Sequence, residues 1–159
     1  MEPTATDVPP LEPEHNSLPM ALLAGSVAAL LGAVVWAVFT IVTDMQLGAI
    51  AILIGFLVGY AVRVFGKGSD PTFQVLGAVL SLVGVIAGNV LTVCVIIGRQ
   101  ADVSLLTVLG RIKPEMLMNA MVETFSPMDL AFYAIAVYEG YKFSRAPVPP
   151  VARVPGLNA

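Results

Sequence analysis

The chain has 159 residues, of which 57% are hydrophobic and only 12% are charged. An ordinary soluble domain carries about 25% charged residues, so a soluble globule of this size would lack the charge needed to cover its surface. The composition therefore excludes most soluble enzyme folds and predicts an integral membrane protein that contacts the lipid bilayer. The net charge is −3 and no basic patch is present, which excludes nucleic acid as a partner.

The two ends of the chain are rich in proline. Residues 1–19 are acidic and contain five of the twelve prolines, a composition typical of a disordered tail. Residues 147–159 are again rich in proline, and we expect a second disordered tail there. The start of the chain has no positive charge and the apolar run after it is too long for a signal peptide. We therefore expect this run to be retained as a membrane helix.

Three long apolar runs predict three membrane spans, at about 20–43, 45–66 and 71–98. The first has 24 residues without a charge, which is about 36 Å of helix at 1.5 Å per residue. This length is enough to cross a hydrocarbon core of about 30 Å with some tilt.

Polar residues at the starts of these runs are typical of helix caps. Thr43 or Asp44 can cap the second helix, with Gln46 placed for a capping box. Asp70 followed by Pro71 is the expected opening of the third helix, with proline at the first helical position.

Residues 99–127 have a different character, because their apolar residues are mixed with charges and Pro114 interrupts them. The pattern predicts two short amphipathic helices that lie at the membrane interface. A re-entrant element is the alternative, and it would need protein to cover its backbone.

A fourth span is predicted over about 128–146. Ser126, Pro127 and Asp129 have the spacing of a helix start with a capping box. The predicted fold class is therefore an all-α membrane protein. It consists of a four-transmembrane-helix bundle over residues 20–146, with an amphipathic helical segment between spans three and four.

Lysine and arginine set the orientation of a membrane protein, because their excess marks the cytoplasmic side. With both termini in the cytoplasm, five basic residues lie inside and three outside. The inner residues would be Arg63, Lys67, Lys142, Arg145 and Arg153, and the outer ones Arg99, Arg111 and Lys113. We therefore expect both termini to be cytoplasmic.

Small residues recur at four-residue spacing, which favours close helix packing in lipid. The pattern is found at Gly55 and Gly59 in the second span and at Gly84 and Gly88 in the third. In the first span a ridge of small residues includes Gly25. Internal packing of the bundle explains this pattern, and an oligomer interface or a substrate groove is the alternative.

Two polar groups stand out within the spans. Glu139 lies inside the predicted fourth span, where an ionisable group costs about 2.5–3.5 kcal/mol on insertion scales. It is either a proton-coupled or ligand-binding carboxylate in the bundle interior, or a surface partner of Lys142 near the headgroups. Asn89 lies in the middle of the third span, where its amide either bonds a neighbouring helix or contacts a ligand.

The remaining chemistry of the sequence is sparse. Arg63 and Lys67 follow the second span and are candidates for binding an anionic lipid headgroup. Cys94 is the only cysteine and His15 the only histidine, so we expect no metal site and no cofactor. No catalytic motif is present, and we do not expect an enzyme.

Several segments of the spans resemble a known protein group. The segments are Trp36-Ala37 in the first span and, in the second, Gly48-Ala49-Ile50-Ala51 and Gly55-Phe56-Leu57-Val58-Gly59-Tyr60-Ala61-Val62-Arg63. With the last helix, they are similar to a widespread group of small bacterial four-helix membrane proteins of unknown function. The resemblance covers 20–98 and 126–146 and implies the bacterial inner membrane, but no activity. Some members carry a cysteine-rich zinc module before the spans, and this sequence lacks those cysteines.

The sequence thus predicts a non-enzymatic, multi-pass membrane protein that acts as an accessory or scaffold subunit. Its partners would be other membrane subunits or further copies of itself. A small transporter or channel that uses Glu139 and Asn89 is one alternative, and a lipid-binding membrane protein is another.

Overall fold

The computed structural model describes residues 16–43 and 48–147. Of these residues 86% are helical, and none forms a strand. The helices are α1 (Leu18–Thr43), α2 (Ala49–Gly66), α3 (Pro71–Ala101), α4 (Leu105–Arg111), α5 (Pro114–Thr124) and α6 (Pro127–Phe143). Three of them, α1, α2 and α3, are long and apolar enough to cross a membrane, and the bent pair of α5 and α6 passes the same test together. The predicted all-helical, membrane-type fold is confirmed at this level.

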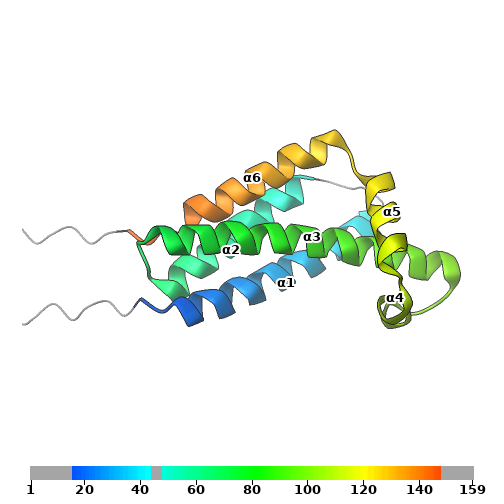
Figure 1. Cartoon of the computed structure of the whole chain (residues 1–159), viewed down its shortest axis with the longest axis horizontal. Coiled ribbons are helices and arrows are strands. Elements are labelled where there is room, and N and C mark those ends of the chain that lie inside the picture. Colours follow the sequence, from blue (N-terminus) through cyan, green and yellow to red (C-terminus); the bar gives the residue numbers. More distant parts are fainter. Residues whose placement is uncertain (1–15, 44–47, 148–159) are drawn as a thin grey trace, which may run out of the picture.

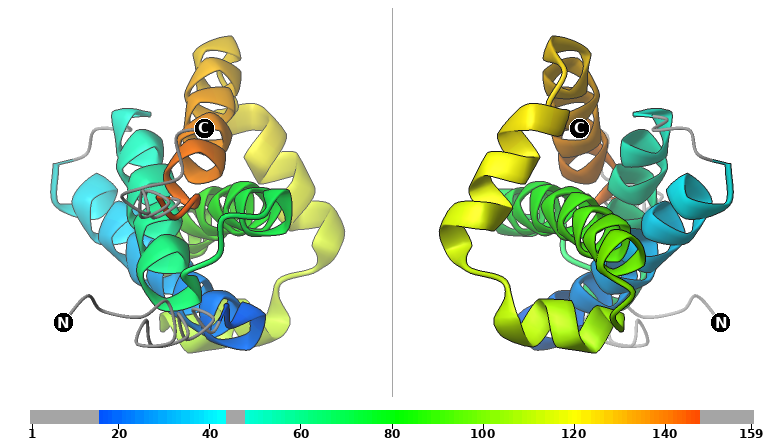
Figure 2. Two further views of the ribbon diagram at one scale, coloured as in Figure 1. Left: turned by 90° about the vertical axis from the view of Figure 1, so that its left-hand side faces the viewer. Right: turned by 90° about the vertical axis from the view of Figure 1, so that its right-hand side faces the viewer.

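Four helices, α1, α2, α3 and α6, run lengthwise beside one another, while α4 and α5 lie across one end (Figure 1). The centre is formed by α2 and α3, which contact each other and both α1 and α6. Within the described residues α1 and α6 share no contact, and α4 and α5 contact only α3. The end-on views show this four-helix cross-section, with α5 passing between α4 and α6 (Figure 2).

Both described ends of the chain meet at the turn between α2 and α3. The Ser17 N–H donates to the Gly66 carbonyl and the Ala146 N–H donates to the Gly68 carbonyl, each at 3.0 Å. We call this the terminal end of the bundle. Residues 102–126, which contain α4 and α5, are called the arm, and they lie at the opposite, arm end (Figure 1).

Two helices are longer than the sequence predicts. α1 begins at Leu18, two residues early, because Pro19 lies in the first turn, where its missing N–H costs nothing. α3 continues three residues further, to Ala101. It ends because Asp102 adopts a left-handed conformation with φ 53° and its N–H bonds the Gly98 carbonyl.

The start of α6 has the predicted capping box. The Ser126 N–H donates to the Asp129 carboxylate at 2.8 Å, and the Met128 N–H donates to the Ser126 hydroxyl at 3.3 Å. α6 ends at Phe143, before the predicted 146, because Pro147 disfavours a helical residue ahead of it.

The starts of α2 and α3 have no side-chain cap hydrogen bond. Asp70 and Pro71 occupy the predicted N-cap and first position of α3. Thr43 does not cap the second helix, because it ends α1 and donates its hydroxyl to the Phe39 carbonyl, while Gly48 is the N-cap of α2. The predicted capping residues Asp44 and Gln46 lie outside the described residues, as does most of both predicted tails.

The interior is built largely from small side chains. The core cluster comprises Ala21, Ala28, Ala29, Trp36, Ala51, Ile54, Val58, Val62, Phe73, Leu80, Val85 and Ala136. Larger apolar residues point outward instead, such as Leu23 and Leu30, which are 62% and 64% exposed. This distribution suits helices that face lipid and pack against one another through small residues.

Candidate functional site

Three of the five predicted packing glycines lie between α1 and α3. A Cβ added to Gly84 would come within 3.2 Å of the Ala29 Cα, and one on Gly88 within 3.3 Å of the Trp36 Cβ. A Cβ on Gly25 would collide with the Leu80 side chain. These glycines therefore bring two helices that run in the same direction into close contact.

The other two packing glycines seat α6 on α2. A Cβ on Gly55 would overlap the Ala136 carbonyl, and one on Gly59 would lie 3.0 Å from both the Gly140 oxygen and the Phe143 Cβ. Because the obstacles include backbone atoms, a side chain here would push the helices apart. All five glycines thus serve contacts within the described bundle.

A reciprocal contact joins α6 to α3. A Cβ on Gly77 would overlap the Ser144 hydroxyl, and one on Gly140 would overlap the Ser81 hydroxyl. Both serines are fully buried, and each donates to the carbonyl four residues before it, at 2.7 Å for Ser81 and 2.5 Å for Ser144. The four-residue spacing of Ala136, Gly140 and Ser144 was the signal that would have predicted it.

The Asn89 side chain lies between α3 and α6 in the half of the bundle nearer the arm. It is 8% exposed, and its Nδ2 donates a hydrogen bond to the Tyr133 hydroxyl of α6. The Tyr133 ring also meets the Phe125 ring edge-on, with 6.2 Å between centroids. Asn89 therefore makes the interhelical bond that its position suggested, and Tyr133 is the partner that the sequence did not identify.

Glu139 lies one turn before the end of α6, on the half of the bundle nearer the terminal end. Its side chain is half-buried, and its backbone carbonyl faces Gly59 of α2. The Lys142 Nζ lies over two rings, 5.6 Å from the centroid of Tyr138 and 5.7 Å from that of Phe143. Within the described residues no ion pair joins Lys142 to Glu139.

The structure does not bring the two predicted polar groups together. Asn89 bonds at the level of Tyr133, which is six residues, or about 9 Å of helix, from Glu139. Core residues of α2 and α3 fill the bundle between these levels. The arrangement therefore offers structural hydrogen bonding at Asn89 and a separate, half-buried carboxylate at Glu139.

The two candidate headgroup residues lie at the terminal end. Arg63 is in the last turn of α2 and half-buried, while Lys67 is the exposed C-cap with φ 52°. The Lys67 N–H donates to the Arg63 carbonyl at 3.0 Å. Lys142 and Arg145 lie near the same end, because α6 runs in the same direction as α2 (Figure 1).

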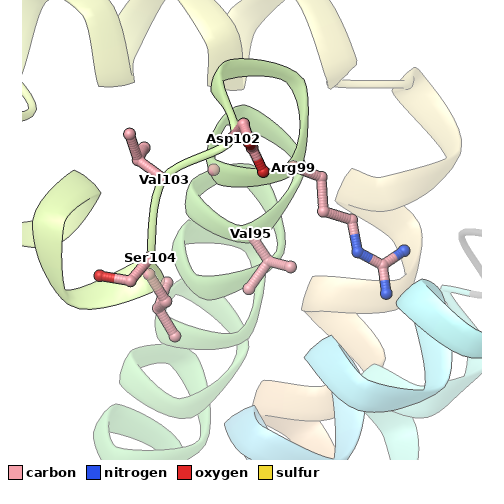
Figure 3. Close-up of a pocket in the computed structure, with 7 residues that line it drawn as sticks. Val95, Arg99, Asp102, Val103 and Ser104 are labelled. Atoms are coloured by element: carbon pink, nitrogen blue, oxygen red, sulfur yellow. The ribbon is translucent and has the colours of Figure 1, made fainter.

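An open pocket of about 390 Å³ lies where α3 turns into α4. Its lining includes Val95, Arg99, Asp102 and Ser104, and Figure 3 shows Arg99 and Ser104 extending to opposite sides. A ligand site needs polar groups that converge, and this pocket does not provide them.

The described part of the chain contains no group of three or more His, Cys, Asp or Glu residues suited to a metal ion. Cys94 is a buried free thiol. Comparison with protein-family models, curated proteins and solved structures finds no match to this chain.

The contact of α6 with α2 at Gly55 allows a direct test of stability. We expect Gly55→Ala to destabilise the bundle by about 1–3 kcal/mol, because the new methyl group overlaps the Ala136 backbone. Gly110→Ala in α4 is the control, since nothing lies within 4 Å of its added Cβ, and it should be neutral or slightly stabilising. Unfolding equilibria in mixed micelles would measure both variants. Equal stability of the two would contradict the close backbone contact.

The hydrogen bond between α3 and α6 can be measured by a double-mutant cycle. Asn89→Leu and Tyr133→Phe should each destabilise the protein, with a coupling energy of about 0.6–1.7 kcal/mol between them, as for other interhelical bonds in membranes. Fully additive effects would show that the two side chains do not interact.

Proposed function

We propose that the chain is a four-span protein of the bacterial inner membrane, with both termini in the cytoplasm, that acts as an accessory or scaffold subunit. The apolar helices support the membrane location, and the resemblance of the spans to small bacterial four-helix membrane proteins supports the cell type. The accessory or scaffold role is supported by two features of the bundle: its interior is tightly packed, and its apolar exterior carries a groove.

Two observations support α6 as the fourth span. Its 17 residues correspond to about 26 Å of helix, and it runs between the two ends of the bundle against α2 and α3 (Figure 1). Its Asp129 and Lys142 lie in the first and last turns, where charge can reach the headgroups and complements the helix dipole.

The accessory role rests on one feature of the exterior, a groove of about 340 Å³ between α1 and α2. Its small residues Ala24, Ala28 and Ala61 are buried or half-buried, while Leu31 and Leu57 beside them are 59% and 40% exposed. Small residues between larger ones let a further membrane helix approach closely. That helix would belong to a partner subunit or to a second copy of the chain.

The topology can be tested with reporters that are active on one side only. With both termini cytoplasmic, a fluorescent-protein fusion at residue 159 should fluoresce, and a phosphatase inserted at the exposed Gly110 should be active outside. The physical basis is the larger number of lysines and arginines at the terminal end. Activity of the phosphatase at residue 159 would instead indicate an odd number of spans or the opposite orientation.

The accessory role can be tested by filling the groove. Purification in a mild detergent followed by native mass spectrometry should yield a complex of fixed composition from the wild-type chain. Ala24→Leu and Ala61→Leu should reduce that complex at least tenfold, because the larger side chains occupy the groove. Ala134→Leu on the exposed side of α6 is the matched control and should leave it intact.

Two outcomes would contradict the proposal. The first is a clean monomer, or a complex that does not respond to the groove variants. The second is solute flux in proteoliposomes that Glu139→Gln abolishes, which would favour the transporter or channel instead.

A further inference from the structure

The first and third helices are two versions of one pattern. With an offset of 52 residues, Ser17, Pro19 and Gly25 match Ser69, Pro71 and Gly77, and the agreement continues along the helix. The later matching pairs are Val27 and Val79, Leu30 and Leu82, Gly32 and Gly84, Val38 and Val90, and Thr40 and Thr92. Residues related by this offset also lie side by side in the bundle. Gly88 packs on Trp36, and these two residues are again 52 positions apart.

The second and sixth helices correspond in the same way. With an offset of 81 residues, Ile54 matches Ile135 and the pair Gly59-Tyr60 matches Gly140-Tyr141. Residues in contact between these two helices are also 81 positions apart, since Gly55 packs on Ala136 and Gly59 on Gly140. The hairpin of α1 and α2 is therefore repeated by α3 and α6.

The two offsets differ by 29 residues, so the second hairpin contains 29 residues that the first lacks. They lie between α3 and α6 and supply the arm. In the first hairpin only residues 44–48 connect the equivalent helices. Helices α4 and α5 of the arm contact only α3 among the four long helices of the described bundle. The end of the arm also meets α6, because the Phe125 ring lies edge-on to the Tyr133 ring.

The surface of α5 indicates what the arm contacts. Leu117, Ala120 and Met121 are half-buried on the side toward α3. Next to them runs an apolar strip, formed by Met118, Val122 and Phe125, which are 62%, 67% and 48% exposed. A polar strip borders the apolar one on the side away from α3, and it is formed by Glu115, Asn119 and Glu123, all exposed.

We propose that the arm is an element added to a duplicated helical hairpin, and that its apolar strip docks on the bilayer surface at the arm end. α5 is bent by 103° from α6, so it lies across the bundle rather than along it. Met128 and Leu130, which follow in the first turn of α6, are also exposed, at 62% and 64%, and the four-span proposal places them against lipid. The inference rests on that proposal, and the acidic polar strip faces water.

Spin labels test this docking in the full-length chain in lipid nanodiscs. In a Cys94→Ala background, labels at Val122→Cys and Glu123→Cys report the two strips, and Leu30→Cys reports the lipid-facing side of α1. The label at 122 should collide with oxygen, which concentrates in lipid, at least threefold more often than the label at 123. The label at 123 should instead collide preferentially with a water-soluble nickel chelate.

Each other outcome overturns the inference. Nickel access at both arm positions would place the arm off the membrane, and exclusion of both reagents at 122 would mean that protein covers the strip. Low oxygen access at Leu30 would overturn the four-span proposal itself, which separates that failure from failure of the docking.

A deletion tests the insertion independently. Replacing residues 96–129 by the sequence of residues 44–48 should leave a bundle that unfolds within a few degrees of the full chain, as followed by circular dichroism in detergent. Loss of cooperative unfolding in this variant would show that the arm is part of the fold rather than an addition to it.

Discussion

Backbone contact between helices is the constraint on which the rest of the molecule depends. Lipid is as apolar as leucine, so burial of apolar side chains gives membrane helices little reason to associate. α6 associates because Gly55, Gly59 and Gly77 remove side chains from its path and Gly140 removes one of its own. Dispersion attraction then acts over the close contact between the helices. A methyl group added at any of these four glycines would clash with backbone atoms, which cannot rotate away as a side chain can.

The packing of α6 on α2 and α3 also determines where its polar groups lie. Because Gly140 is held against α2 and α3, the neighbouring Glu139 and Lys142 are kept near the terminal end, where Lys142 rests on aromatic rings. The same packing brings Tyr133 to Asn89 at the other half of the helix. Neither group needs a polar path through the bundle to be stable, and this favours a structural part for Asn89.

Composition and local pattern were sufficient for the helical, membrane-type fold and for most helix starts, since charge, proline and capping residues act within a few residues. Contacts between helices were harder to predict. The glycines at 55 and 59 were predicted to pack, but their partners Ala136 and Gly140 were not, because the contact joins residues 81 positions apart and no local pattern pairs them. The bond from Asn89 to Tyr133 spans 44 residues, and no local pattern encodes it.

The repeated hairpin separates the features that build the fold from those that distinguish its two halves. Residues that match between the halves, such as Gly32 and Gly84, pack against the same side chain, Ile54. The positions equivalent to Asn89, Glu139 and Lys142 are Ala37, Val58 and Ala61, so the first hairpin packs in the same way without these polar groups. The bond from Asn89 to Tyr133 is therefore a feature of the second hairpin alone, added to a pattern of glycine contacts that the two halves share.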